Sequence, residues 1–513
     1  MPEQGSEMKA VAVSRPGRPE KAQSFWKAFE ASFFGRHPFL LVFLVAVVPR
    51  ALLGLFAPYD GLDWPIVYRI VAENIYLNHC VSQSPPLSAV CAPHWGGNQL
   101  PGFPAFAALA WWLSAKSDLA ILVGQSMLTG AAICWLMHAI KQLTKSGRIA
   151  LAAGLVTALS PVCLGWARSL NTEALAVATT IWVLAELFLS MAGKRLRILP
   201  LGIALACAAF IRFDNILLCF LVVPCAFAIY RPGEALRRGI AVAMVFAVPL
   251  LAWTARSVAA GLPLIPTVNI VASINPDGSV LFPVGVKKYY LSWLANATDQ
   301  RTFSMPIYNG AYHELYVPDK VFDSELERRR VHRLISRLSE LRNKPIPKDI
   351  DDEFGAIAAE RYAHDPMRQI VWLPLSRLRT MWINPFYSWG LPIGFDRAEV
   401  SIAMKRRFDT GGANAILQAA LDNPGFALGK AIANGYLIAL LAAFAGLFAA
   451  LFRAPPPPHV WMVFMLALTL VLVRSLFLVS VAQVESRYII ECVPAIEVAV
   501  ILGLASFRKR LAR

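Results

Sequence analysis

Long apolar runs, most of them close to twenty residues, recur along this 513-residue chain. A helix of about 20 apolar residues crosses the hydrocarbon core of a bilayer, and only helices and closed barrels satisfy their backbone hydrogen bonds inside lipid. Hydrophobic residues make up 57% of the chain and charged residues 16%, whereas soluble domains are roughly 25% charged. The pattern therefore predicts an all-α polytopic membrane protein. The predicted spans are 38–57, 118–141, 149–164, 171–192, 198–211, 214–231, 239–258, 427–452, 459–481 and 488–506.

Basic residues alternate with these spans in a regular way. If residues 1–37 form a cytoplasmic lead, every inner loop is basic, as the positive-inside rule requires. These loops are 141–148, 193–197, 231–238, 453–459 and 508–513. The apolar run 101–115 is short, and Pro101 and Pro104 lie in its first turn. Counting it as a full span would move all later basic loops to the outer side of the membrane. We therefore interpret it as a half-helix or interfacial segment. The formal charge of +16 then reflects cytoplasmic loops and anionic headgroups, and we expect no nucleic-acid partner.

The same alternation divides the chain into four parts. A cytoplasmic lead (1–37) precedes a transmembrane module (38–258) that includes a first external loop, 58–117. An external domain (259–426) and C-terminal helices with a basic tail (427–513) follow.

The external domain contains helical patterns with one apolar face. Leu326, Val331, Leu334, Ile335, Leu338 and Leu341 lie on the first such face, and Phe354, Ile357, Ala358 and Tyr362 lie on the second. The segment 367–390 mixes tryptophan with arginine, which favours a helix lying in the membrane interface; a distorted span is the alternative. Cys80 and Cys91 flank a polar stretch of the first loop and would pair if that loop faces an oxidising compartment.

Acids and arginines occur together at the outer ends of the spans. Charged groups at membrane depth are costly and mark functional sites. Sugar transfer requires a carboxylate to accept a hydroxyl proton and cations to hold a phosphate leaving group, for which arginine is well suited. The outer-junction residues are Asp60, Asp63, Arg168, Asn171, Glu173, Arg212, Asp214, Glu485, Arg487 and Tyr488.

The order of these elements resembles a known family. An acid after the first span is followed by "YRIVAENI", "PGFP", "SLNTEALA", an Arg-x-Asp junction, a large outer domain and a late "ESRYIIECVP". This order is similar to that of the type C glycosyltransferases (GT-C), in the bacterial branch related to protein O-mannosyltransferases and the lipid A aminoarabinose and galacturonic acid transferases. The resemblance implies a bundle of about 10–13 transmembrane helices, a polyprenyl-phosphate-sugar donor, and inverting transfer to a glycolipid, polysaccharide or protein hydroxyl. It also implies a bacterial inner-membrane enzyme whose site faces the periplasm.

The resemblance assigns roles to particular residues. The acid of the first external loop matches Asp63, which stands five residues before Tyr68 where the family has about four. Trp64 stands where many relatives have a second acid. Asp60 therefore remains an alternative base.

The late Arg-Tyr pair matches Arg487 and Tyr488, with the arginine facing the donor phosphate. Arg212 is a second candidate for contact with this phosphate. Glu173, Asp214 and Glu485 are expected to line the same cavity. His94 and Trp95 of the first loop are candidates for sugar contact, and a packed loop is an equal alternative.

Other functions remain open at this stage. No cluster of His, Cys, Asp or Glu has metal-ligand spacing, and we expect neither a metal nor another cofactor. A transporter or flippase for a lipid-linked sugar would place ionisable residues near span centres, for which Arg256 and Arg474 are the nearest candidates. An envelope polymer ligase or a non-catalytic scaffold are further alternatives. The sequence names neither the sugar nor the acceptor.

Overall fold

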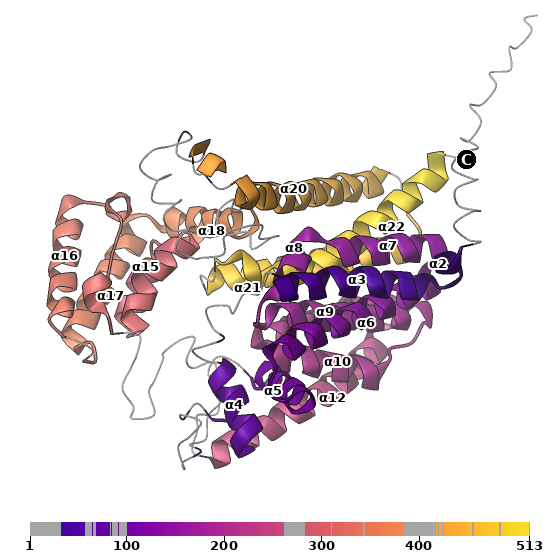
Figure 1. Ribbon diagram of the computed structural model, residues 1–513. Coiled ribbons are helices and arrows are strands. Elements are labelled where there is room, and N and C mark those ends of the chain that lie inside the picture. Colours follow the sequence, from indigo (N-terminus) through magenta and orange to yellow (C-terminus); the bar gives the residue numbers. More distant parts are fainter. Residues whose placement is uncertain are drawn as a thin grey trace, which may run out of the picture.

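The structure is a computed structural model that describes most of the chain. The described residues are 32–56, 64, 68–82, 84, 91, 100–260, 283–308, 310–341, 344–383, 414, 417–418, 420–422, 424–453, 456–481 and 484–511. In this part the chain forms helices and no strand, which confirms the all-α fold class. Figure 1 shows a bundle of long helices with a smaller group, α15–α18, beside one end.

The helices follow the hydropathy pattern closely. The α-helices are α2 (Phe33–Arg36), α3 (Pro38–Phe56), α4 (Arg69–Asn78), α5 (Gly102–Ser114), α6 (Asp118–Thr144), α7 (Gly147–Leu159), α8 (Pro161–Leu164), α9 (Glu173–Ala192), α10 (Ile198–Ile211), α11 (Val222–Ile229), α12 (Pro232–Ala259), α14 (Val284–Leu291), α15 (Ala297–Tyr308), α16 (Glu325–Ser339), α17 (Lys348–His364), α18 (Leu373–Trp382), α20 (Pro424–Arg453), α21 (Pro458–Ser480) and α22 (Val493–Leu511). The 3-10 segments are η2 (Gly165–Arg168), η3 (Phe213–Leu221), η4 (Tyr312–Glu314), η5 (Asp319–Val321), η7 (Ser486–Tyr488) and η8 (Ile490–Cys492), and η6 (Arg368–Trp372) is a π-helical turn.

Within the described residues, seven helices are long and apolar enough to cross a membrane, or eight if one bent pair is a single span. Three shorter apolar helices accompany them: Gly102–Ser114, Ile198–Ile211 and Phe213–Ile229. Each segment predicted from hydropathy is therefore helical, and the chain is a polytopic membrane protein.

The bent pair replaces the single span expected at 149–164. Its two helices, Gly147–Leu159 and Pro161–Arg168, meet at 44°. Pro161 has no backbone N–H to continue the helix, so carbonyls of the preceding turn lose their partners. The buried Arg50 of α3 donates to one of them, the Ala158 carbonyl, at 2.7 Å, and to the Ala46 carbonyl of its own helix at 2.9 Å.

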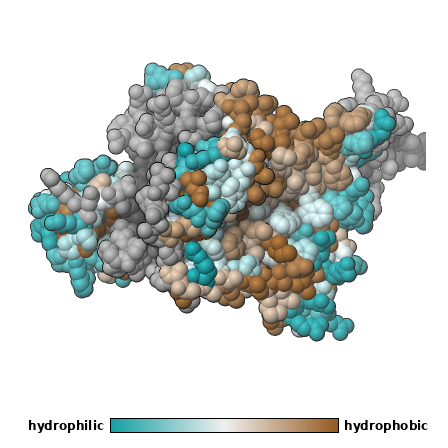
Figure 2. Space-filling view, turned by 60° about the horizontal axis from the view of Figure 1, so that its bottom comes forward, coloured by the Kyte–Doolittle hydropathy of each residue, from teal (hydrophilic) through white to brown (hydrophobic). Residues whose placement is uncertain are grey.

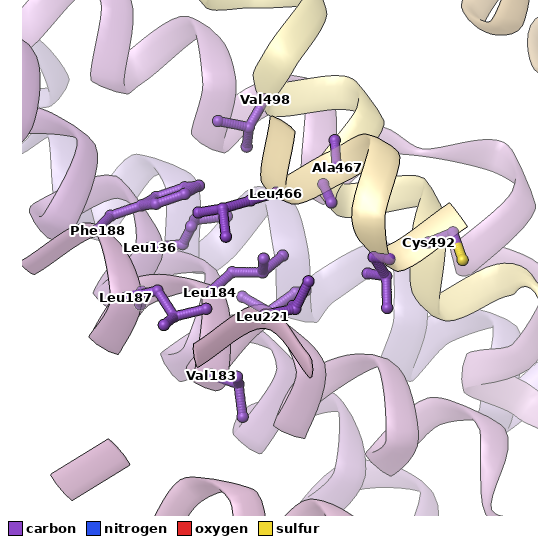
Figure 3. Close-up of a cluster of buried hydrophobic side chains, with 14 of the residues drawn as sticks. Leu136, Val183, Leu184, Leu187, Phe188, Leu221, Leu466, Ala467, Cys492 and Val498 are labelled. Carbon is purple, nitrogen blue, oxygen red and sulfur yellow. The ribbon is translucent and has the colours of Figure 1, made fainter. Parts of the chain in front are cut away.

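Helix α9 lies at the centre of the bundle, and 83% of its apolar stretch is buried inside the protein. Side chains from α6, α9, η3, α21, η8 and α22 meet around it in one apolar core (Figure 3). Members of this core include Leu136, Val183, Leu184, Phe188, Leu221, Leu466, Cys492 and Val498. By contrast, only 17% of the apolar stretch of α12 and 22% of that of α3 is buried. Their exposed apolar side chains are therefore suited to contact with lipid (Figure 2).

The helices α14–α17 have an apolar core of their own. Tyr289 of α14 packs against Phe303 of α15 and Phe354 of α17. The predicted apolar faces largely supply this core, through Val331, Leu334, Leu338, Phe354, Ile357 and Ala358. Two of the predicted residues are wrong: Leu326 and Tyr362 are exposed. Leu326 lies in the first turn of α16, and Tyr362 lies in the last turn of α17.

Helix α18 connects this domain to the bundle. The buried Arg377 donates to the Leu294 carbonyl at 2.9 Å and, across the junction, to the Val479 carbonyl of α21 at 3.3 Å. Trp382 donates to Ser475 of α21 at 2.9 Å. Ile370 and Trp372, which precede α18, are exposed. Exposed apolar side chains are compatible with the interfacial position predicted for 367–390, which stays a prediction, as do the four domain boundaries.

The structure joins Cys80 and Cys91 in a disulfide, with their Cα atoms 6.6 Å apart. The pairing that the sequence left open is therefore present.

Candidate active site

Three helix junctions and one residue inside α21 bring charged side chains together at one end of the bundle. Helix α10 ends at Ile211, the extended Arg212 follows, and η3 then places Asp214 beside it. Glu173 opens α9, Arg474 lies in α21, and η7 and η8 form the irregular entry to α22. We call the resulting group the charge cluster. It consists of Glu173, Arg212, Asp214, Arg474, Glu485, Arg487, Tyr488 and Glu491.

The inner half of the charge cluster is a closed set of two arginines and two acids. Arg212 meets Asp214 at 3.2 Å through two parallel contacts and meets Glu491 at 3.0 Å. Arg474 meets the same two carboxylates at 2.6 Å and 3.1 Å, and donates to the Asn215 side chain at 2.9 Å. The side chains of Arg474 and Glu491 are fully buried. Such a set is stable only while every charge keeps its partner.

The outer half surrounds Arg487. Its guanidinium meets Glu485 at 2.6 Å and Glu173 at 3.6 Å, and donates to the Tyr488 hydroxyl at 3.2 Å. The Tyr488 ring lies between two guanidinium groups, 4.5 Å from that of Arg212 and 5.0 Å from that of Arg487. Of the three arginine side chains, that of Arg487 is the most exposed, at 16% against 5% and 0% for the other two. Arg487 is therefore the arginine of the cluster best placed to meet a ligand.

Six residues that the sequence singled out come together here although they lie far apart along the chain. They are Glu173, Arg212, Asp214, Glu485, Arg487 and Tyr488. The sequence reasoning assigned Arg474 only to the transporter alternative and gave Glu491 no role. Arg474 follows an apolar run and Glu491 lies inside "ESRYIIECVP". A charge within an otherwise apolar segment was the signal available for both.

Four predicted site residues, Asp60, Asp63, His94 and Trp95, lie outside the described residues. The residue that follows Asp63 is described. Trp64 is buried, with its ring 6.0 Å from that of Phe103 and 5.7 Å from that of Trp111. It belongs to the same apolar cluster as Leu175, which is two residues from Glu173. The chain just after Asp63 is thus packed on α5, in a cluster that also includes Leu175 of α9.

An apolar groove begins next to the charge cluster and runs along the bundle. Its volume is about 640 Å³, and α5, α6, α9 and α10 form its walls. Leu175 and Ile211 line one end, two residues from Glu173 and one residue from Arg212 respectively, while Trp135 and Glu186 line the other. From Leu175 to Glu186 the groove follows α9 for roughly 16 Å, taking 1.5 Å per residue.

Gly102 makes the wall of this groove possible at the start of α5. A Cβ atom at this position would stand 2.4 Å from the carbonyl oxygen of Phe210 in α10. Only glycine permits so close a backbone approach, and the "PGFP" segment therefore packs directly on the end of α10.

In the part of the chain that the structure describes, no three His, Cys, Asp or Glu side chains gather in a way that would hold a metal ion. The expectation that neither a metal nor another cofactor takes part stays a prediction.

No protein-family model and no curated protein sequence matches the chain significantly. Among solved structures, the chain is similar to the crystal structure of ArnT from Cupriavidus metallidurans bound to undecaprenyl phosphate. The likeness covers 96% of this chain and 79% of that chain, with 13% sequence identity and a TM-score of 0.34. A likeness of this extent does not define the reaction of this protein.

Proposed function

We propose that this protein is an integral membrane glycosyltransferase of the GT-C type. In this proposal, it transfers a sugar from a polyprenyl-phosphate donor to an acceptor hydroxyl, with inversion, at the periplasmic face of a bacterial inner membrane. The observation that carries the proposal is the charge cluster, in which three arginines and four carboxylates meet at one end of an apolar groove. A lipid-linked phosphate needs both features, because its head is anionic and its tail is a hydrocarbon.

In the proposed reaction the acceptor oxygen attacks the anomeric carbon of the donor sugar. The bond between that carbon and the phosphate oxygen breaks, and its electron pair leaves with the lipid phosphate. A carboxylate of the first external loop takes the proton of the acceptor hydroxyl, which makes the oxygen a better nucleophile. We assign this role to Asp63, with Asp60 as the alternative, on the sequence resemblance and on the packing of Trp64 in the apolar cluster that includes Leu175 of α9.

Arg487 is the proposed ligand of the donor phosphate. The leaving phosphate gains a negative charge as the bond breaks, and a fixed guanidinium near it lowers the barrier. Arg212 and Arg474 are engaged with Asp214 and Glu491, so we assign them the role of holding Tyr488 and the entry to α22 in place. This narrows the direct phosphate contact, for which Arg212 was a second candidate, to Arg487 and Tyr488.

The acids around Arg487 have a consequence for binding. Glu173 and Glu485 already occupy its guanidinium, and the donor phosphate must replace one of these contacts. A fixed carboxylate partner orients the arginine but competes with the ligand. Glu173, Asp214 and Glu485 are therefore proposed to shape the cavity and not to bind the phosphate.

The test has a cellular part and a binding part. A deletion strain is expected to accumulate a polyprenyl-linked sugar and to lack that sugar on one envelope glycan, glycolipid or protein. Wild-type protein should restore the sugar, whereas Asp63→Asn should not. Asp349→Asn serves as the control, because this exposed acid lies in the external domain. Restoration by Asp63→Asn but not by Asp60→Asn would transfer the base role to Asp60, and restoration by both would refute a carboxylate base in this loop.

Binding of undecaprenyl phosphate to the purified protein tests the phosphate site separately. Arg487→Gln should weaken binding about 10- to 100-fold, which corresponds to the loss of a charge-assisted contact of roughly 1.5–3 kcal/mol. Glu485→Gln removes a competitor and should strengthen binding. Weaker binding in both variants would show that Glu485 supports lipid binding by orienting Arg487. That result would contradict the proposed competition between Glu485 and the phosphate.

The same strain separates the enzyme from a transporter for lipid-linked sugars. Accumulated donor without any missing sugar would point to translocation and would overturn the transferase assignment.

A further inference from the structure

A second polar cavity lies at the other end of the bundle, away from the charge cluster. Helix α9 connects the two: it begins at Glu173 in the cluster and ends at Ala192, next to this cavity. Its 20 residues span about 30 Å, which is the thickness of the hydrocarbon core of a bilayer. The two sites therefore face opposite membrane surfaces.

The walls of this cavity come from the loop between α9 and α10 and from the start of α12. Its volume is about 700 Å³, and its lining is half polar and half apolar. We call it the basic cavity. It is lined by Leu189, Gly193, Arg195, Leu196, Arg197, Pro200, Tyr230 and Arg238.

The backbone around the basic cavity is fixed by side chains. The Leu196 N–H donates to the Tyr230 hydroxyl at 2.9 Å, and the Arg197 N–H donates to Ser190 at 3.1 Å. These contacts hold the α9–α10 loop against the end of α11. The cavity is thus a built feature of two packed loops and not a gap between mobile chain ends.

Positive charge exceeds negative charge at this site. Arg197 meets Glu186 at 2.8 Å, and Arg238 meets Glu234 at 3.4 Å. Arg195 meets no carboxylate among the residues that the structure describes. The cavity therefore presents a surplus guanidinium, and an anion that enters it also meets the outer N–H groups of the two paired arginines.

An exposed apolar strip lies on α10 beside the basic cavity. It consists of Leu199 and Ile203, which are one turn apart and both exposed. Leu199 directly precedes Pro200, which lines the cavity. An anionic head in the cavity would thus place an attached hydrocarbon chain on a matching surface.

We propose that the basic cavity binds the phosphate headgroup of an anionic phospholipid, with its acyl chains on the apolar strip of α10. Arginine clusters between helices at a membrane surface are suited to such headgroups, and each adds attraction to an anionic leaflet. The apolar strip favours a lipid over free phosphate, because free phosphate would gain nothing from it. This site is separate from the donor site proposed above and does not depend on that reaction.

The test compares lipids with matched acyl chains on the full-length protein in detergent. Phosphatidylglycerol should raise the apparent melting temperature more than phosphatidylcholine does. The double variant Arg195→Gln/Arg238→Gln should bind phosphatidylglycerol about 30-fold more weakly, since each arginine near an anionic surface contributes a factor of about five. The matched control is Arg237→Gln, which removes the same charge one residue away, from a side chain that is 76% exposed and does not line the cavity.

The outcomes separate the alternatives. Loss of lipid binding in the double variant with retention in Arg237→Gln supports the proposal. Equal losses in both would show a diffuse charge effect and would overturn it. An equal temperature shift from inorganic phosphate would overturn the lipid assignment. If the double variant does not purify as a folded protein, Arg195→Gln alone is used, because this side chain has no ion pair to lose within the described structure.

Discussion

Replacing Arg474 with glutamine tests whether the inner charge cluster is a closed electrostatic unit. The Arg474 side chain is fully buried and meets Asp214 at 2.6 Å and Glu491 at 3.1 Å. Without it, both carboxylates must share Arg212. Removing one partner of a buried ion pair typically costs about 3–5 kcal/mol, because the remaining charge stays buried without compensation. We expect a loss in this range for Arg474→Gln.

A matched substitution at the surface should behave differently. Arg337 of α16 also pairs with an aspartate, Asp349 of α17, but both side chains are about half exposed. Water and salt screen such a pair, and its expected contribution is about 0.2–1 kcal/mol. Arg337→Gln therefore removes the same charge by the same chemistry and should cost several-fold less.

The measurement is a denaturant titration of the full-length protein in mixed micelles, followed by tryptophan fluorescence. A double variant, Arg474→Gln/Glu491→Gln, restores the charge balance around Arg212 and should be more stable than the sum of the two single losses predicts. A coupling of about 1.5–3 kcal/mol is expected for residues in one such network. A loss below about 1 kcal/mol in Arg474→Gln, or strict additivity in the double variant, would refute the closed-unit interpretation.

Two further substitutions test local packing and the disulfide. Gly102→Val places side-chain atoms against the Phe210 carbonyl and should lower the free energy of unfolding by at least about 1–3 kcal/mol. As a control, a Cβ atom at Gly446 would meet nothing within 4 Å, so Gly446→Val should be close to neutral. Equal shifts of the melting temperature in the two variants would contradict the close approach at Gly102. Cys80→Ser opens a loop whose cysteines are 11 residues apart and should cost about 3 kcal/mol by loop-closure entropy. Limited proteolysis should cut this loop faster in the variant, and unchanged cleavage would argue against the disulfide as a constraint.

The helices were the most predictable feature, because lipid allows few alternatives. A backbone in hydrocarbon must satisfy its hydrogen bonds internally, so each long apolar run had to be helical, and each is. The errors occurred where tertiary packing overrides periodicity. Leu326 matches the apolar face of α16 but is exposed in its first turn, whereas its neighbour Glu327 is buried and pairs with Arg361 of α17 at 3.1 Å. The break at Ser160–Pro161 also depended on context, because Arg50 of another helix donates to the Ala158 carbonyl in the last turn before the proline.

The candidate site divides in the same way. The sequence alone determined that acids and arginines occur at the outer span ends, because a charge in an apolar chain is conspicuous and costly. Only the tertiary structure decided which of them meet. It paired Arg212 and Arg474 with Asp214 and Glu491 and left Arg487 as the most exposed guanidinium. The residue type fixes the sign of a charge. Its role depends on how many opposite charges the fold brings within about 4 Å of it, and a local sequence pattern does not determine that count.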